Sequence, residues 1–334
     1  MATSIKEVAR EAGVSIGTVS NVLNRPGIVT PAVRERVQAA ITKLGYVRND
    51  PARQLRAGRS RTVALVVLDI ANPFFADVAR GADEVADASD AIAIICDSHQ
   101  DAKREQRILD RLEEQRVLGV LITPVTDGPD SRVERLIDRG MPVVLVDRAS
   151  GHPSRCSVAV DDVLGGQLVG AHLLAQGHRR IAYVGGPMRI RQVADRQAGL
   201  ADALGTRAEL LTVEMPSLTV AAGRAAARSL TESGPGVTAV ACANDLLALG
   251  VLQELTRQGV RVPEDIAVVG YDDIEAAAAA VVPLTSVRRP REQLGRTAAQ
   301  LLLEEVNDPG HQHRHVVFKP ELVVRGSTAQ LAAA

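Results

Sequence analysis

Two hydrophobic patterns divide the chain near residue 61. Before that point, apolar residues recur at spacings of three and four, which is the period of an amphipathic helix. After it, short continuous apolar runs alternate with helical segments, as in VALVVL (63–68) and VLGVLI (117–122). Continuous apolar runs are typical of strands in parallel sheets that helices cover on both faces. The two patterns predict a small all-α head followed by an α/β body.

The head is predicted to contain three short helices. Residues 4–7 have the S-x-x-E form of a capping box, which opens a helix that ends at Gly13. A second helix begins behind Ser15, and a third runs from Pro31 until Gly45 stops it. Because only a short glycine-containing turn joins the first two helices, they are predicted to form a helix-turn-helix.

The second helix has one apolar side and one small, polar, uncharged side. Gly17 and Asn21 lie on the polar side, although a glycine inside a helix costs about 0.5–1 kcal/mol relative to alanine. In a helix-turn-helix this element enters the major groove, where a glycine allows close approach and an asparagine pairs with an adenine edge. The alternative is a small helical bundle with a polar surface. The candidate DNA-contacting residues of this helix are Ser15, Ile16, Gly17, Thr18, Ser20, Asn21 and Asn24.

A short arginine-rich stretch, YVRNDPARQLRAGRSR (46–61), follows the third helix. Asn49 caps a predicted helix of barely two turns, in which Leu55 is the single large apolar residue. Minor-groove proteins insert such residues between base steps while arginines hold the backbone, so Arg53, Leu55 and Arg56 are DNA-binding candidates. A charged linker with an incidental leucine is the alternative interpretation.

The charge distribution indicates a nucleic-acid partner for the head alone. Residues 1–61 carry 11 Lys/Arg against 4 Asp/Glu, whereas the whole chain of 334 residues has a formal net charge of -1. A basic head on an acidic body indicates that only the head meets a polyanion, although a solvated basic surface would have the same composition.

We expect no membrane partner, no cofactor and no metal. The sequence has no run of about 18 apolar residues, and its N-terminus is charged where a signal peptide is apolar, so a cytoplasmic location is expected. The three cysteines are far apart and indicate neither a disulfide framework nor a zinc site. In HQHRH (311–315) three histidines alternate on one side of an extended segment, and a surface edge beside the strand VVFKP is favoured over a metal site.

The body contains two series of about four predicted strands, which indicates two similar lobes. Ligands of parallel sheets bind outside the carboxyl ends of the strands, and a cleft between two lobes would gather those ends. Carboxylates, amides and an aromatic residue at such ends suit a polyhydroxylated ligand, because they can accept from or bridge neighbouring hydroxyls. Each aspartate taken singly is also explained as a helix N-cap. The candidates near these strand ends are Asn72, Phe74, Asp147, Arg148, Asn244 and Asp272.

These motifs together resemble those of one family. SIKEVAREAGVSIGTVSNVLN and the following TPAVRERVQAAITKLGYVRNDPARQLRAGRS are similar to the headpiece and hinge of the LacI/GalR family of bacterial transcriptional regulators. NPFFADVARG, ACANDLLALG and VPEDIAVVGYDD are similar to its core, so the resemblance covers nearly the whole chain. It implies that Ile16, Gly17 and Asn21 occupy base-reading positions and that Leu55 is inserted at the centre of a palindromic operator.

The resemblance also implies a fold with defined domain limits. The expected fold class is an all-α three-helix helix-turn-helix headpiece with a hinge helix, followed by an α/β two-lobed core like a periplasmic binding protein, with two parallel doubly wound sheets. The expected domains are the headpiece at 1–48, the hinge helix and linker at 49–61, the N-terminal lobe at 62–159 and 290–318, and the C-terminal lobe at 160–289 and 319–330.

Effector-contacting positions are implied in the same way. Phe74, Arg196, Asn244 and Asp272 match such positions of the family, and Asp147 and Arg148 come next. The variable pocket positions, residues 190–192 and Leu218, do not match a purine-binding pattern. The resemblance therefore favours a sugar or a sugar derivative as the effector.

The leading hypothesis is a homodimeric DNA-binding transcriptional regulator, acting as a repressor and not as an enzyme. Two headpieces would read the halves of a pseudo-palindromic operator in double-stranded DNA, under the control of an effector in the cleft. A solute-binding protein with the same body would need a signal peptide and would lack the basic head. An enzyme acting on a sugar or nucleotide is the other alternative, but the sequence has no G-x-S-x-G, P-loop, H-E-x-x-H or dinucleotide-binding glycine motif.

The substitution Leu55→Ala tests the predicted wedge. It should weaken operator binding about tenfold or more, because the inserted side chain stabilises the kinked duplex, and it should leave effector binding intact. Fluorescence anisotropy of a labelled operator and a thermal-shift titration of the effector measure the two properties. An unchanged operator affinity would argue against insertion.

Overall fold

The computed structural model describes residues 3–46, 60–125, 132–150, 152–232, 236–308 and 310–328. The chain separates into two compact units, residues 1–59 and 60–334. We call the described part of the first unit the headpiece and that of the second unit the core. Among the described residues, every helix is too short or too polar to cross a bilayer.

The headpiece contains the three predicted helices. They are α1 (Ile5–Ala12), α2 (Ile16–Asn24) and α3 (Pro31–Leu44), and each contributes a fully buried valine to one small core. The predicted capping box is present, since the Glu7 carboxylate accepts from the Ser4 backbone N–H at 2.7 Å. The loop before α3 contains a short 3-10 helix, η1 (Pro26–Ile28), that the sequence analysis did not predict.

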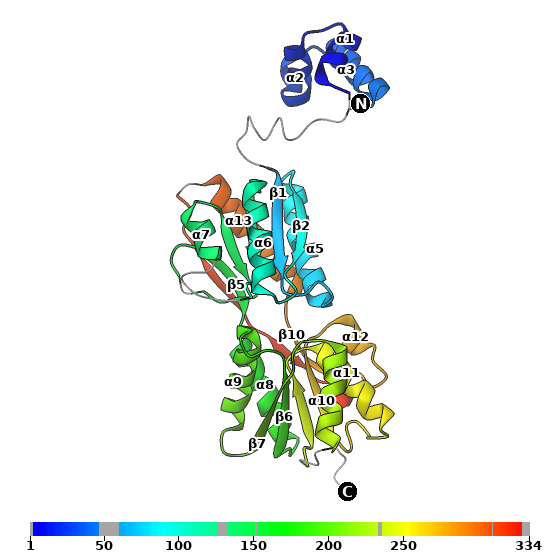
Figure 1. Ribbon diagram of the computed structural model, residues 1–334, viewed down its shortest axis with the longest axis vertical. Coiled ribbons are helices and arrows are strands. Elements are labelled where there is room, and N and C mark those ends of the chain that lie inside the picture. The colour runs from blue at the N-terminus through cyan, green and yellow to red at the C-terminus, as the bar shows by residue number, and fades with distance from the viewer. Residues whose placement is uncertain are drawn as a thin grey trace. The chain divides into compact units, whose positions relative to one another are not determined.

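The core contains two six-stranded sheets (Figure 1). The first has the order β11-β5-β4-β3-β1-β2 and is parallel throughout. The second has the order β12-β10-β9-β8-β6-β7, and its edge strand β12 is antiparallel to β10. The strands of the first sheet are β1 (Thr62–Val67), β2 (Ile92–Asp97), β3 (Gly119–Ile122), β4 (Val143–Val146), β5 (Cys156–Val160) and β11 (His315–Phe318). Those of the second are β6 (Arg180–Gly185), β7 (Glu209–Glu214), β8 (Ala239–Cys242), β9 (Ala267–Asp272), β10 (Thr285–Arg288) and β12 (Glu321–Val323).

Helices cover both sheets, and each sheet with its helices forms one lobe of the core (Figure 1). The first lobe is the first sheet with its helices, and the second lobe is the second sheet with its helices. In the first lobe, α13 packs on α5 and on strands β3, β4 and β5, so the chain returns to this lobe after the second sheet. Helices of the first lobe are α5 (Pro73–Ala88), α6 (Ala102–Glu114), α7 (Arg132–Asp138) and α13 (Arg291–Asn307). Those of the second are α8 (Asp162–Ala175), α9 (Arg191–Leu204), α10 (Val220–Glu232), α11 (Asp245–Arg257), α12 (Glu275–Ala278) and the 3-10 helix η2 (Gly326–Thr328).

The expectation of about four strands in each lobe was too low, because some strands are not continuous apolar runs. In β10, Thr285 and Ser286 are buried and polar, and their hydroxyls are bonded inside the second lobe. In β5, the buried Ser157 hydroxyl lies 2.9 Å from the His315 Nδ1 on the neighbouring strand. Buried hydroxyls with partners are stable in a core, but they interrupt the hydrophobic pattern of the sequence.

Two glycines allow α5 and α13 to touch backbone to backbone. A Cβ added to Gly81 would lie 2.0 Å from the Glu292 carbonyl oxygen, and one added to Gly295 would lie 1.9 Å from the Val78 carbonyl oxygen. Any side chain at either position therefore requires the two helices to separate. The pairs α8–α9 and α10–α11 approach in the same way, through Gly166 with Gly199 and Gly223 with Gly250.

The substitution Gly295→Ala should destabilise the core by about 1–3 kcal/mol, because the added methyl group forces α13 away from α5. Urea denaturation followed by circular dichroism measures the change. Gly326→Ala is the matched control, since its Cβ would meet its nearest neighbour at 3.5 Å. The packing argument fails if Gly295→Ala unfolds at the same urea concentration as the control.

Candidate functional site

The carboxyl ends of strands from both lobes meet at one cleft in the core. About 440 Å³ of space free of protein atoms lies in and at the mouth of this cleft, part of it open to solvent. Asp147 follows β4 of the first lobe, while Asn244 follows β8 and Asp272 ends β9 of the second lobe. The lining residues are Leu68, Asp69, Asn72, Phe74, Phe75, Gln100, Asp147, Ile190, Gln192, Val193, Arg196, Leu218, Asn244, Asp272 and Arg289.

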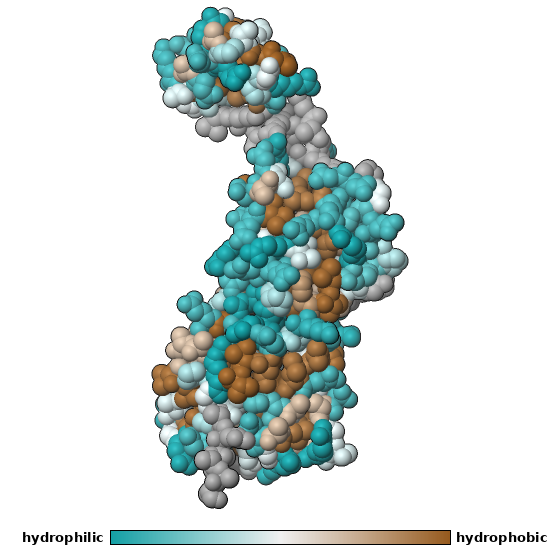
Figure 2. All heavy atoms as spheres, turned by 180° about the vertical axis from the view of Figure 1, so that it is seen from behind, coloured by the Kyte–Doolittle hydropathy of each residue, from teal (hydrophilic) through white to brown (hydrophobic). Residues whose placement is uncertain are grey.

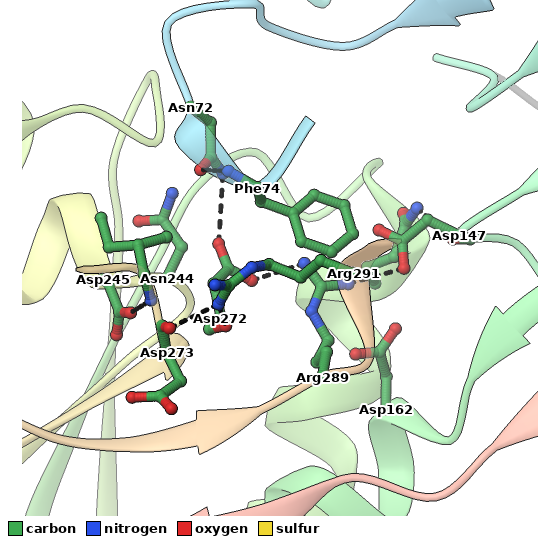
Figure 3. Close-up of polar contacts among 12 residues, drawn as sticks. Asn72, Phe74, Asp147, Asp162, Asn244, Asp245, Asp272, Asp273, Arg289 and Arg291 are labelled. Atoms are coloured by element: carbon green, nitrogen blue, oxygen red, sulfur yellow. Dashed lines mark hydrogen bonds and ion pairs between the residues drawn. The ribbon is translucent and has the colours of Figure 1, made fainter. Parts of the chain in front are cut away.

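A buried arginine connects the two lobes at this cleft (Figure 3). The side chain of Arg289 is only 2% exposed, and it donates to the Asp147 carboxylate of the first lobe at 2.6 Å. Its other terminal nitrogen donates to the Asp272 carboxylate of the second lobe. Its guanidinium carbon lies 3.5 Å from the centre of the Phe74 ring, so the cation also stacks on an aromatic face.

Asn72 forms a second link between the lobes. Its amide nitrogen donates to the Asp272 carboxylate at 3.1 Å, while its amide oxygen accepts from the Phe74 backbone N–H at 3.0 Å. Asn72 therefore caps the N-terminus of α5 and reaches across the cleft with the same side chain. Together, Asn72 and Arg289 occupy both oxygens of the Asp272 carboxylate.

Asp147 and Asp272 differ from ordinary aspartates in their backbone conformation, and Asp147 differs also in its pKa. Burial raises the pKa of Asp147 to about 6, against the lowering effect of the Arg289 cation. The backbone φ is 55° at Asp147 and 115° at Asp272, and residues other than glycine rarely adopt such positive values. Such strain is retained where the surrounding contacts determine the conformation, and it is common at ligand-binding sites.

Arg196 belongs to the second lobe and contacts the floor of the cleft. Its Nε donates to the Asp162 carboxylate at 2.8 Å, and one terminal nitrogen donates to the Ala243 carbonyl oxygen at 2.6 Å. Its guanidinium carbon lies 3.8 Å from the centre of the Tyr271 ring. Arg196 is thus fixed from three sides, as a residue that presents a directed charge to a ligand must be.

The polar side of α2 forms a separate candidate surface on the headpiece. Gly17 and Asn21 are exposed, and Ile16 is 45% exposed. The Ser15 hydroxyl caps the helix by accepting from the Thr18 backbone N–H at 3.1 Å. A Cβ added to Gly17 would have the Ser15 Oγ as its nearest neighbour, at 3.6 Å. The fold therefore has room for alanine at Gly17, and it does not require the less stable glycine.

Comparison with known proteins identifies both units. The family described as bacterial regulatory proteins of the lacI family matches residues 4–49, and a periplasmic binding protein-like domain matches residues 170–328. The transcriptional repressor PurR of Aliivibrio fischeri is 32% identical over 336 residues, which cover 98% of this chain and 99% of that protein. The transcriptional regulator CelR of Thermobifida fusca is 36% identical over 334 residues, covering 97% and 98%. The chain belongs to the lacI family.

Solved structures of this family have the same architecture. The Lac repressor dimer bound to operator and the anti-inducer ONPF superposes with a TM-score of 0.87 at 26% identity, covering 98% of this chain and 99% of that one. A complex of CelR with cellobiose gives a TM-score of 0.71 at 34% identity, covering 97% and 99%. A LacI family regulator from Enterococcus faecium with bound ribose gives 0.73 at 29%, covering 81% and 99%. The predicted family, fold class and function as a LacI-type DNA-binding transcriptional regulator are confirmed.

The cleft of this LacI-family chain brings together six of the seven predicted effector residues, namely Asn72, Phe74, Asp147, Arg196, Asn244 and Asp272. The alternative interpretation of the aspartates as helix N-caps is wrong for Asp147 and Asp272, since α12 is capped by Ile274 and Asp147 follows β4 without opening a helix. The asparagines Asn72 and Asn244 are the residues that cap helices, α5 and α11, while they line the cleft. Arg148 is the exception. It lines an adjoining hollow with Arg191 and Asp195, where burial, followed by the Arg191 cation, lowers its pKa.

Both phenylalanines of the NPFF motif lie at the cleft. Phe74 is fully buried and Phe75 is 6% exposed, and their rings meet edge to face with centres 5.0 Å apart. In the structure both rings are buried, and the face of Phe74 is covered by Arg289.

The sequence analysis missed Arg289, the most connected side chain of the cleft. It lies in the run VRRPRE (287–292), where composition does not separate it from Arg288 and Arg291. Burial distinguishes them in the structure, because Arg288 at the end of β10 is exposed whereas Arg289, the next residue, is buried. Asp245 follows β8, and its partners lie within the second lobe: its carboxylate accepts hydrogen bonds from the Ser286 hydroxyl and the Ile274 backbone N–H. Burial raises the pKa of Asp245 to about 8.

The predicted residues of the headpiece have different surroundings. Two separate pairs bond along α2: the Ser15 and Thr18 hydroxyls lie 2.9 Å apart, and the Asn24 amide donates to the Ser20 carbonyl oxygen at 2.8 Å and to the Ser20 hydroxyl. Asn21 extends from the exposed side of the helix. Arg53, Leu55 and Arg56 lie outside the described residues.

The substitution Gly17→Ala separates folding from DNA binding. It should stabilise the headpiece by about 0.5–1 kcal/mol, because alanine is the better helix former and has room. It should also weaken operator binding by about 1–3 kcal/mol, because the added methyl group prevents close approach to the groove. Thermal denaturation and anisotropy titrations at fixed salt measure the two effects. The control is Gly27→Ala, whose Cβ meets no atom within 4 Å; equal affinity of the two variants would contradict the groove contact.

Proposed function

We propose that this LacI-family regulator is a repressor whose operator binding is controlled by a sugar or sugar derivative in the inter-lobe cleft. One observation carries the proposal. Two aspartates from different lobes, Asp147 and Asp272, converge on one cation, Arg289, beside the face of Phe74. A ligand that bonds to these groups necessarily acts on the contacts that hold the lobes together.

The chemistry of the cleft suits hydroxyl groups. The Asp147 and Asp272 carboxylates accept hydrogen bonds, and the Arg196 and Arg289 cations donate them. The Asn72 amide can both accept and donate. A sugar ring that took the place of the Arg289 guanidinium would pack against the apolar face of Phe74. The related CelR–cellobiose complex and the ribose-bound Enterococcus faecium regulator support this ligand class.

Competition for the same groups explains how a ligand would change the regulator. Hydroxyls that bond to Asp272 displace part of its contact with Arg289 or with Asn72, and they thereby change the free-energy difference between two arrangements of the lobes. Linkage requires operator DNA to change the affinity for the sugar by the same factor as the sugar changes the affinity for the operator. The cleft thus has the differential contacts that allosteric control needs.

A homodimer on pseudo-palindromic double-stranded DNA is part of the proposal. Hydrophobic residues gather in patches on the face of the core in Figure 2. Edge strand β2 exposes Ile92 (62%) and Ile95 (43%), and edge strand β7 exposes Leu211 (39%). Exposed apolar edges are normally covered, and a second copy related by a two-fold axis would cover them and present two headpieces to two half-sites. The dimeric Lac repressor–operator structure supports this assembly.

The proposal assigns binding without turnover to the cleft. Asp147 and Asp272 both form ion pairs with the buried Arg289, which suits them as acceptors for ligand hydroxyls. The relatives compared above are transcriptional regulators. Incubation of the protein with its sugar, followed by chromatography of the recovered sugar, tests for turnover.

The proposed control by a sugar is tested with an operator duplex selected from a random library. The ligands tested are ribose, cellobiose, glucose, galactose and nucleosides. At least one sugar should raise the melting temperature and change the operator affinity about fivefold or more. Stabilisation by nucleosides alone would overturn the proposed ligand class. A sugar that binds without any change in operator affinity would overturn the proposed control.

The substitution Asp272→Asn tests the role of the central carboxylate. It should weaken sugar binding about 10- to 100-fold, because a hydrogen bond to a charged group is lost. Isothermal titration calorimetry measures the sugar affinity. Asp195→Asn, in the adjoining hollow, is the matched control and should bind the sugar normally. Equal sugar affinities of the two variants would remove Asp272 from the binding site.

A further inference from the structure

Four side chains from distant parts of the chain converge at the edge of the first sheet. Cys156 begins β5, Glu305 lies in the last turn of α13, and His311 and His313 precede β11. One donor atom from each residue lies within 4.8 Å of the donors of all the others. The three histidines alternate on one side of the segment as expected, since all three rings contact residues of β5. The expected surface edge is wrong for His311 and His313, whose side chains are largely buried against Cys156 and Glu305.

The donors lie near the spacing of a tetrahedral ligand set, with some pairs slightly too close or too far apart. The Cys156 Sγ lies 3.1 Å from the His311 Nε2 and 3.7 Å from the His313 Nδ1, and the latter lies 4.0 Å from the Glu305 Oε2. Metal–ligand bonds of about 2.0–2.3 Å place the ligands of a tetrahedral zinc site about 3.3–3.8 Å apart. Small movements of the side chains therefore bring all four donors to one ion.

The surroundings of the cluster also match a metal site. The Glu305 Oε2 is buried and, among the described residues, has no hydrogen-bond partner, which is costly for a carboxylate without a cation. The backbone N–H of Arg314 donates to the Cys156 Sγ at 3.3 Å. The second ring nitrogen of His311 lies 3.9 Å from the Glu304 carboxylate, the kind of outer partner that orients a ligating histidine.

We propose that Cys156, Glu305, His311 and His313 form a structural binding site for one Zn²⁺ ion. Thiolate and imidazole donors favour zinc over magnesium or calcium, and four protein ligands leave no open position for catalysis. The thiolate and the carboxylate together neutralise the charge of the ion. Zinc at this site fastens β5, α13 and the segment before β11 at the amino-terminal end of the sheet, whereas the effector cleft lies at the carboxyl end.

The test uses the full chain without a polyhistidine tag, stripped with a chelator and then dialysed with Zn²⁺. We expect one zinc ion per chain by elemental analysis, retained against a colorimetric chelator, and a higher melting temperature with zinc than without it. Substitution with Co²⁺ should give a thiolate-to-cobalt absorption band and the strong visible bands of tetrahedral coordination. Zinc retained below one half equivalent, or a cobalt spectrum without the thiolate band, overturns the proposal.

Variants distinguish this cluster from other zinc-binding groups. Cys156→Ser and His313→Gln should each lower the zinc affinity at least tenfold, and their circular dichroism in the absence of zinc reports whether they fold. His315→Gln is the matched control from the same HQHRH segment, because its ring contacts the Ser157 hydroxyl instead of the cluster. Folded variants that bind zinc as tightly as this control overturn the assignment. Since the site is separate from the cleft, its failure leaves the proposed control by sugar untouched.

Discussion

A guanidinium group held between two carboxylates of different lobes is the interaction on which the core depends. Removing a cation from water costs several kcal/mol, and the cost is offset only where partners surround the charge. Arg289 has such partners in Asp147, in Asp272 and in the face of Phe74. Because these partners come from both lobes, the buried charge is stable only while the lobes keep their present relation.

Because of this constraint, a ligand that binds in the cleft also changes the contacts that hold the two lobes together. Asp272 is held by Arg289 and Asn72, and its backbone adopts a conformation that is unfavourable for an aspartate. A ligand that replaces either partner releases a contact between the lobes at the moment when it gains one of its own. Control of a transcription factor requires this kind of exchange, since a ligand with equal affinity for both states shifts no population.

Much of this architecture could be predicted from the sequence, for reasons that lie in local chemistry. Ser4, Gly13, Ser15 and Gly45 mark helix ends by their own hydrogen bonds or backbone preference, and the structure has helix boundaries at these residues. Five of the six strand-end candidates line one cleft because parallel strands direct their carboxyl ends to a common edge.

What could not be predicted depends on contacts between distant segments. Arg289 resembles its neighbouring arginines until β10 is placed in the sheet. Cys156 and Glu305 can be recognised as possible metal ligands only in the folded structure, where α13 packs on the first lobe and the following segment places His311 and His313 beside them. The polar strands β5 and β10 escaped the hydrophobic pattern because their hydroxyl groups find partners on other elements.

The return of α13 and β11 to the first lobe has a consequence for synthesis on the ribosome. The first five strands of the first sheet are made early, but β5 remains an open edge until residues 315–318 emerge, after β6–β10 of the second lobe. A nascent chain therefore exposes this edge from the completion of β5 at Val160 until β11 emerges, and it exposes the α5 surface around Gly81 until α13 emerges. Until then the unpaired edge is a place where the nascent chain can associate wrongly with other chains, which is the risk that chaperones counter.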